Sequence, residues 1–233
     1  KPFKPFRLDN VFWGPEYTEE QMLDAISKFD FKYTKEAEPE KKVAELLAQG
    51  YVVGRFNGRM EYGPRALCNR TILAPTQKSD VNKWLNKRLN RTEFMPFAPV
   101  TLDYMVDKMY KNADKLRYTA EFMTITTDCM PEMTEVSPAA VHVDGTARPQ
   151  IVTSASNPTM YKILQHYYAL TGVPNLVNTS FNMHEEPIIC TPYDAVKTFD
   201  DGRLDFLSLG NYILESPHLK KETANDLSIR VQQ

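Results

Sequence analysis

Arginine side chains gather in a short stretch of the chain that is otherwise rich in turn residues. The stretch NGRMEYGPRALCNR, residues 57–70, contains three arginines and one carboxylate: Arg59, Arg65, Arg70 and Glu61. Asn-Gly and Gly-Pro pairs are strong turn signals, so these arginines are expected on loops. A guanidinium can bind a phosphate through two parallel hydrogen bonds. The stretch therefore indicates a site that holds an anion.

The positive charge of this region is local. From Arg55 to Arg91 the sequence has nine Lys or Arg and two Asp or Glu, although the whole chain has a formal net charge of -2. A solvated basic surface is one interpretation, because exposed charges often have no specific partner. A binding site is the other, because loops on a rigid scaffold frequently carry function.

A second polar segment, HVDGTARPQ, places His142 and Arg148 on either side of an Asp-Gly turn. Arg148 is a further candidate for contact with an anion. His142 and Asp144 could ligate a metal, but two ligands at this spacing do not define a site. A loop histidine held by hydrogen bonds is the simpler interpretation of His142.

A third segment, NLVNTSFN, ends an apolar run in four hydrogen-bonding residues, namely Asn178, Thr179, Ser180 and Asn182. Ligands of open α/β sheets bind beyond the carboxyl ends of strands. Amides and hydroxyls placed there can bind a neutral polar group such as a carbamoyl. Asn and Ser also commonly cap turns, and that alternative stays equally open.

The proline-rich segment RTEFMPFAPV, residues 91–100, is interpreted as neither a regular helix nor a central strand. Arg91 can point at an anion, while the aromatic and proline side chains form a rigid apolar wall. Hydrophobic packing of a stiff loop is the alternative.

The composition restricts the class of protein. The chain has 233 residues, 42% of them hydrophobic and 25% charged, which is typical of a globular protein with a core. Its net charge gives no general attraction to nucleic acid, and no apolar run approaches the roughly 20 residues that span a bilayer. Three scattered cysteines predict neither disulfides nor zinc but a reducing cytoplasm. The start, without Met, predicts a segment of a longer protein.

Helices and strands are expected to alternate from residue 40 onward, which predicts the α/β class. Residues 1–17 are expected to form an irregular arm, 32–42 a solvated charged surface and 131–141 a loop. Helices are expected over 18–29, 40–49, 80–89, 157–170 and 191–201, and strands over 51–53, around 120–127, and over 175–182, 204–209 and 211–214.

These segments, in this order, resemble the C-terminal region of the carbamoyltransferase family that includes the nodulation-factor and tobramycin O-carbamoyltransferases. The resemblance covers about residues 45–215 and rests on GRMEYGPRALCNRTILA, FMPFAP, HVDGTARPQ, TGVPNLVNTSFN and EEPIICTPYDA. Cys68 stands where family members usually have Gly, and Met95 where many have Arg. The resemblance implies a YrdC-like α/β fold, with a twisted open sheet and flanking helices.

The resemblance also implies a domain organisation. Residues 1–44 would be an interdomain arm with the first helix, 45–218 the YrdC-like domain and 219–233 a tail. An N-terminal ASKHA-like domain with a metal-binding histidine motif is not in this chain. The C-terminal domain would convert carbamoyl phosphate and ATP into carbamoyl-adenylate, and the N-terminal domain would transfer the carbamoyl group to an acceptor hydroxyl. This chain alone is therefore expected to lack the complete transferase reaction.

Both substrates are polyanions, so cations fixed in a closed site would stabilise the developing charge, and Mg²⁺ would bridge the phosphates. No metal site made of protein side chains is expected. Glu61 is expected to orient an arginine through an ion pair. The candidate catalytic residues are Arg65, Arg148, Asn178 and Ser180. The candidate substrate-binding residues are Arg59, Arg65, Arg70, His142, Arg148, Asn178, Thr179, Ser180 and Asn182.

Two other functions compete with this one. A non-catalytic module would bind substrate only when docked to its N-terminal domain. RNA binding through the basic stretch 55–91 ranks lower, because aromatic residues are not interleaved with the basic ones. The expected partners are small-molecule substrates and the N-terminal domain, with no membrane; oligomerisation stays open.

Overall fold

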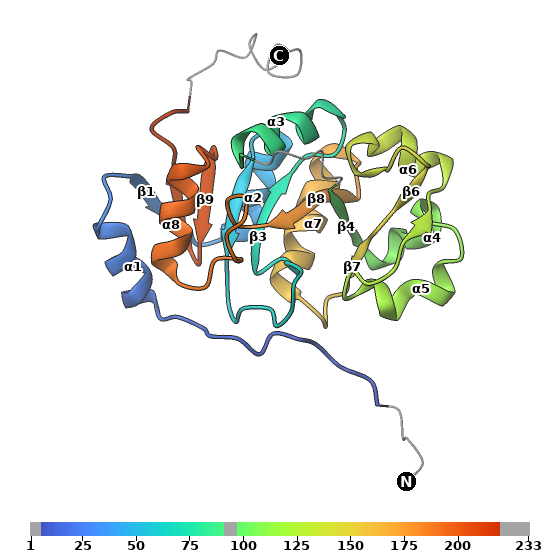
Figure 1. Cartoon of the computed structure of the whole chain (residues 1–233), viewed down its shortest axis with the longest axis horizontal. Helices are drawn as coiled ribbons and strands as arrows, with labels where there is room; N and C mark the ends of the chain where they lie inside the picture. The colour runs from blue at the N-terminus through green and yellow to red at the C-terminus, as the bar shows by residue number, and fades with distance from the viewer. Residues whose placement is uncertain (1–5, 91–96, 220–233) are drawn as a thin grey trace.

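An eight-stranded mixed sheet forms the centre of the molecule (Figure 1). The structure is a computed structural model of the chain, and it describes residues 6–90 and 97–219. The strand order is β1-β10-β9-β2-β3-β8-β4-β7. The strands are β1 (Lys32–Lys35), β2 (Val53–Phe56), β3 (Arg70–Ala74), β4 (Ala98–Leu102), β7 (Gln150–Val152), β8 (Asn175–Ser180), β9 (Phe206–Leu209) and β10 (Tyr212–Glu215). A separate pair joins β5 (Thr127–Asp128) to β6 (Thr146–Ala147).

Helices cover both faces of this sheet. One face packs against α1 (Glu19–Ser27), α3 (Asp80–Arg88) and α8 (Pro192–Asp201). The other packs against α2 (Pro39–Ala48) and α7 (Pro158–Thr171). Successive residues of a strand point to opposite faces, so Ile72 joins the first core and Leu73 the second. The predicted α/β class is confirmed.

A third, smaller core lies beside β7. It contains α4 (Val106–Met109), α5 (Ala113–Ala120) and α6 (Pro131–Val136), and the short 3₁₀ turns η1 (Asp103–Met105) and η2 (Pro138–Ala140) flank them. Tyr110 and Met133 are fully buried there, and Ile151 of β7 links this core to the sheet. The sequence did not predict α4 or α5.

Local signals set the ends of the predicted helices. Thr18 and Gln21 form a capping box at α1, and Thr191 does the same with Asp194 at α8. Asn157 accepts a hydrogen bond from the amide of Met160 at the start of α7. Gly172 ends α7 with a φ of 72°, a left-handed conformation that suits glycine. These helices are confirmed with boundaries shifted by a few residues at most.

The proline-rich segment is partly a strand, so the expectation that it could not be a central strand was wrong. β4 contains Pro99 and lies between β8 and β7. Pro99 pairs with Val177 of β8, whereas the ladder with β7 begins at Val100. The proline therefore sits where the second ladder has not yet started, which tolerates its missing N–H. Residues 91–96, with Arg91 and Met95, lie outside the described residues.

Three other expectations need correction. The segment around 120–127 is mainly the end of α5 and a turn, because Ala120 is buried in the third core and Met123 has a φ of 55°. Residues 131–141 contain α6 and η2 rather than only loop. The charged residues 32–35 are exposed as predicted, yet they form the edge strand β1 by pairing with β10.

Residues 6–17 form an irregular arm, as predicted. Figure 1 shows the arm running along the lower edge of the view, beneath the loop that joins β2 to β3. Two backbone hydrogen bonds tie it to Met60: Gly14 N donates to Met60 O, and Met60 N donates to Pro15 O. Within the described ranges, no helix has the length and apolar character needed to cross a bilayer.

Candidate anion-binding site

Arg65 and Arg148 come from different loops and lie close enough to influence each other. Arg65 is exposed on the loop between β2 and β3, and Arg148 is half-buried just before β7. Burial lowers the pKa of Arg148, and the positive charge of Arg65 lowers it further. The positive charge of Arg65 is thus near enough to disfavour the charged form of Arg148.

Within residues 6–90 and 97–219, no ion pair neutralises either arginine. Nε of Arg148 is also buried and without a hydrogen-bond partner there. Unpaired buried donors are costly, and perturbed charges of one sign are typical of functional sites. The pair is therefore a candidate for contact with an anion.

His142 belongs to the same cluster. Its pKa is lowered by burial and by the charge of Arg148, while Asp144 opposes the shift. Nδ1 lies 3.0 Å from the hydroxyl of Thr146, which also donates to Asp144 at 2.7 Å. His142 is thus a loop histidine held by hydrogen bonds. Among the residues that the structure describes, no three His, Cys, Asp or Glu side chains are grouped to hold a metal ion.

Within residues 6–90 and 97–219, Glu61 forms no ion pair with an arginine, contrary to the expectation. Its Oε1 accepts three backbone amides, from Leu67 at 2.7 Å, Asn69 at 2.7 Å and Arg70 at 3.1 Å. The described ion pairs do not include it. Its carboxylate instead holds the backbone of the segment after Arg65 through these three hydrogen bonds.

Arg70 is fully buried, and its two terminal nitrogens are occupied, whereas its Nε has no hydrogen-bond partner among the described residues. It donates to the backbone carbonyls of four residues, namely Asn57, Asn69, Pro15 and Gly58. The guanidinium also stacks on the ring of Phe56 at 3.6 Å. Burial lowers its pKa to about 10, and Glu61 opposes that shift. Arg70 therefore fixes the loop and the arm from within.

Arg59 is exposed and also contacts the arm. Its Nε donates to the carbonyl of Gly14 at 3.2 Å, and its NH2 group donates to that of Trp13 at 2.9 Å. Arg59 and Arg70 thus secure the arm, whereas Arg65 and Arg148 make no hydrogen bonds to it over residues 6–17.

Asn178 is buried beneath the two loops. Its Nδ2 donates to Ala66 O at 3.0 Å and to Gln150 Oε1 at 2.6 Å, and its Oδ1 accepts from the hydroxyl of Thr71. Ala66 follows Arg65, and Gln150 lies two residues after Arg148. Asn178 consequently lies between the segments that carry both arginines.

The other residues of NTSFN are distributed around the end of β8. Ser180 pairs with Thr71 of β3 and is half-buried, and Thr179 is almost completely buried. Asn182 lies beyond the strand, where its Nδ2 donates to the carbonyls of Met183 and Glu186. Asn182 therefore caps a turn, which was the alternative for this segment.

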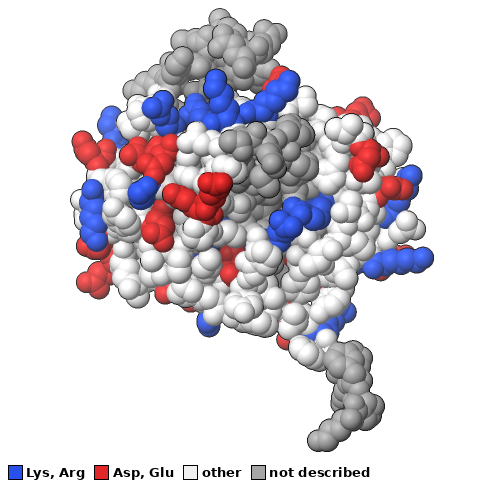
Figure 2. Space-filling model, viewed as in Figure 1, with Lys and Arg blue, Asp and Glu red and all other residues white. Residues whose placement is uncertain are grey.

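The basic stretch 55–91 does not form one surface. Arg55 and Arg70 are buried, whereas Lys83, Lys87 and Arg88 belong to α3. Figure 2 shows basic side chains along the upper edge of the view, over α3, and Figure 1 places the loop 57–69 at the opposite end of β3. The local charge excess is therefore divided between two ends of the sheet.

The family model described as "Carbamoyltransferase C-terminus" matches residues 44–216. The chain belongs to the carbamoyltransferase C-terminal family. Nodulation protein NolNO of Sinorhizobium fredii is 35% identical over 229 residues, which is 94% of this chain and 32% of the relative. The 3'-hydroxymethylcephem-O-carbamoyltransferase of Amycolatopsis lactamdurans is 31% identical over 187 residues, 80% of this chain and 34% of the relative. Family membership supports a role in carbamoyl transfer.

The chain spans 34% to 41% of the length of the first curated relatives it matches. Two solved HypF structures share its fold. Full-length HypF in the phosphate- and nucleotide-bound form has a TM-score of 0.54 at 17% identity, covering 77% of this chain and 25% of HypF. HypF of T. kodakarensis has a TM-score of 0.51 at 17% identity, covering 78% and 22%. These similarities agree with the YrdC-like fold implied by the sequence.

The loop between β2 and β3 contains a cysteine in a left-handed backbone conformation. Cys68 has a φ of 81°, which favours glycine. Its side chain is buried, and burial raises its pKa. Sγ donates to Gln150 Oε1 at 3.0 Å. This contact gives the cysteine a structural partner at a strained position.

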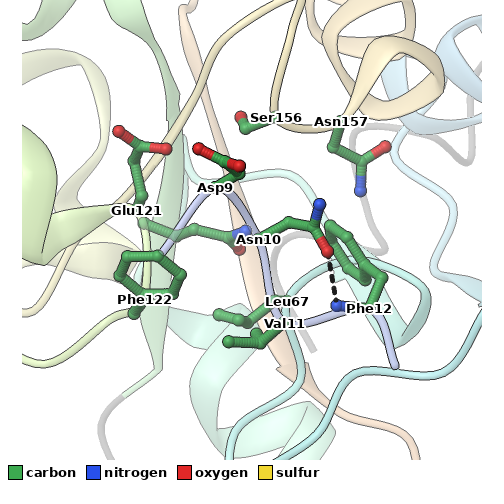
Figure 3. Close-up of a pocket in the computed structure, with 10 residues that line it drawn as sticks. Asp9, Asn10, Val11, Phe12, Leu67, Glu121, Phe122, Ser156 and Asn157 are labelled. Atoms are coloured by element: carbon green, nitrogen blue, oxygen red, sulfur yellow. Dashed lines mark hydrogen bonds between the residues drawn. The ribbon is translucent and has the colours of Figure 1, made fainter. Parts of the chain in front are cut away.

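A small pocket opens between the arm and the body of the domain (Figure 3). Leu67 and Gln150 line it, together with the arm residues 9–12 and with Ser156 and Asn157. Asp9 and Glu121 also face it, and burial raises the pKa of Glu121 while Arg7 opposes that shift. The two carboxylates make this cavity unsuited to a phosphate.

Sequence reasoning missed two buried groups beside the site. Arg55 donates to Cys68 O at 2.6 Å and to Thr159 Oγ1 at 2.7 Å, which joins the loop to α7. Gln150 joins the loop to β7 and β8. Gln150 stands only two residues after Arg148 in HVDGTARPQ, so this spacing was the signal available for it.

Proposed function

We propose that this carbamoyltransferase domain binds carbamoyl phosphate and ATP and forms carbamoyl-adenylate. The observation that carries the proposal is the approach of Arg65 and Arg148, because two positive charges from separate loops lie near each other and no carboxylate of the described residues forms an ion pair with either. A phosphate bound between them would relieve their repulsion. The HypF structure crystallised with phosphate and nucleotide supports this substrate class.

The reaction needs fixed cations. Water cleaves carbamoyl phosphate to carbamate and inorganic phosphate, and a carbamate oxygen then attacks the α-phosphorus of ATP and displaces pyrophosphate. Both steps bring anions together, so preorganised positive groups lower their barriers. Mg²⁺ would arrive with the nucleotide and neutralise phosphate charge.

The residues take different roles in this proposal. Arg65 and Arg148 hold the phosphate, His142 lies beside them as a neutral hydrogen-bonding group, and Ser180 and Thr179 orient the carbamoyl or adenylate. The remaining candidates, Arg59, Arg70, Asn178 and Asn182, support the loops. Asn178 has both amide hydrogens committed to protein acceptors, so its proposed contribution is to hold the site in shape.

The complete transfer would need more than this chain. We propose that residues 1–44 connect the domain, residues 45–218, to an upstream ASKHA-like domain that transfers the carbamoyl group to an acceptor hydroxyl in the cytoplasm, and that residues 219–233 form a tail. The arm supports this arrangement, because residues that precede α1 bind directly to the arginine loop. The isolated chain would then perform only the adenylate-forming half.

Exchange of labelled pyrophosphate into ATP, dependent on carbamoyl phosphate, tests the proposal with the 233-residue chain. Exchange that disappears in Arg148→Ala is the expected result. Binding of both substrates without exchange would favour a substrate-binding module. Calorimetry of this chain and of a chain extended upstream then separates the two, because only a module predicts that affinity depends on the added domain.

A further inference from the structure

Gln150 joins the two segments that carry Arg65 and Arg148. It is the first residue of β7 and is 3% exposed. Its Oε1 accepts from Nδ2 of Asn178 at 2.6 Å and from Sγ of Cys68 at 3.0 Å. One carboxamide therefore connects β7, β8 and the loop between β2 and β3.

The chemistry of the donors and acceptors determines how these amides are oriented. Ala66 O can only accept, so the atom of Asn178 that lies 3.0 Å from it is the amide nitrogen. The atom of Gln150 that faces this nitrogen must then be its oxygen. The hydroxyl of Thr71 donates to the remaining oxygen of Asn178. The network is buried and each of these contacts is satisfied, which favours a single geometry.

We propose that Gln150 is a positioning residue that sets the separation between Arg65 and Arg148. The path runs from Arg148 along the backbone to Gln150, through both hydrogen bonds of Asn178 and into Ala66, whose neighbour is Arg65. Both arginines lie outside regular strands and helices, so these buried bonds hold their backbones together. The inference rests on the proposed function, because it describes how the same anion site is built.

Replacing Gln150 tests this inference in the 233-residue chain. Gln150→Met keeps a similar volume but removes the acceptor for both donors. A misplacement of about 1 Å can cost roughly a hundredfold in function. We expect the Kd for carbamoyl phosphate to rise at least roughly tenfold, which corresponds to about 1.4 kcal/mol. Gln150→Asn keeps the amide but is too short for both partners, so it should also weaken binding, and it carries the test if Gln150→Met does not fold.

Thr76→Val is the matched control. It removes a buried hydroxyl that lies within hydrogen-bonding distance of Ser137 Oγ at 3.0 Å and of Asn175 O, at the start of β8, at 3.2 Å. This change should lower thermal stability to a similar degree while leaving the Kd unchanged, measured well below each unfolding midpoint. A merely structural role for Gln150 predicts the same Kd in both variants.

The outcomes separate this inference from the proposed function. Normal affinity in folded Gln150 variants, with weak binding in Arg65→Ala and Arg148→Ala, overturns the inference alone. An equal loss in Thr76→Val and Gln150→Met also overturns it, because the effect would then be general destabilisation. Normal affinity in both arginine variants overturns the proposed function itself.

Discussion

Glu61 should be among the most important single residues for the stability of the arginine loop. It is 4% exposed, and its Oε1 accepts the amides of Leu67, Asn69 and Arg70. Glu61→Ala would leave three amides without this acceptor. An unsatisfied buried donor costs about 1–3 kcal/mol, and water entering the space would return part of the loss. We therefore expect Glu61→Ala to lower the free energy of unfolding by about 4 kcal/mol.

Glu61→Gln distinguishes the charge from the hydrogen bonds. The amide can still accept at Oε1, but the bonds lose their charge assistance, and new donors point where Oε2 is buried without a partner in the described structure. A loss of about 2 kcal/mol is expected, from the difference between charged and neutral hydrogen bonds. Glu186→Gln, at an exposed loop position, is the control and should change stability by less than about 0.5 kcal/mol.

Urea unfolding measures these free energies, and amide hydrogen exchange shows which backbone amides lose protection. The amides of Leu67, Asn69 and Arg70 should lose protection in Glu61→Ala more than those of α7. A loss below about 1 kcal/mol, with unchanged exchange at these three amides, would show that the carboxylate does not organise the loop.

Three further predictions concern His142, the cysteines and the arm. Burial and Arg148 depress the pKa of His142, so the free energy of unfolding should fall as the pH drops below about 6.5, where the unfolded chain takes up the proton first. In urea unfolding, His142→Gln should reduce this dependence of stability on pH. An unchanged dependence would show that another group causes it. Cys190 is half-exposed whereas Cys68 and Cys129 are buried with raised pKa values, so a thiol reagent should label Cys190 first by mass spectrometry. Arg59→Ala should speed proteolysis of the arm with a stability loss of about 1 kcal/mol or less; arm cleavage at the normal rate would contradict its tethering role.

Local sequence patterns predicted the helices whose end signals contact residues only a few positions away in the chain. Thr18, Thr191 and Gly172 each mark a helix end through contacts with near neighbours, and these ends were placed well. The strand β4 was not predicted, because a proline at position 99 is tolerated in the strand only if the hydrogen-bond ladder with β7 begins after it. The region after Ala120 was not predicted either, since α5 ends in the third core at Ala120 and the chain then turns at Met123, whose φ is 55°.

At the candidate site, too, the sequence indicated some features, and contacts between distant parts of the chain decided others. Residue type suggested Arg65 and Arg148 as anion contacts, which stays a prediction, and Arg65 lies on a separate loop close enough to lower the pKa of Arg148. Residue type also suggested an ion pair for Glu61 and a phosphate contact for Arg70. Whether a charge meets a ligand, an opposite charge or backbone groups depends on distant parts of the chain. Arg70 reaches Pro15 of the arm, 55 positions away, which no local pattern indicates.

Titration calorimetry with carbamoyl phosphate tests the central claim most directly. Arg65→Ala and Arg148→Ala should each weaken binding by roughly ten- to a hundredfold, as expected for the loss of a charge-assisted contact of about 1.5–3 kcal/mol. Lys87→Ala removes an exposed positive charge on α3 and should bind like the wild type. Unchanged affinity in both arginine variants, or an equal loss in Lys87→Ala, would contradict a built anion site between Arg65 and Arg148.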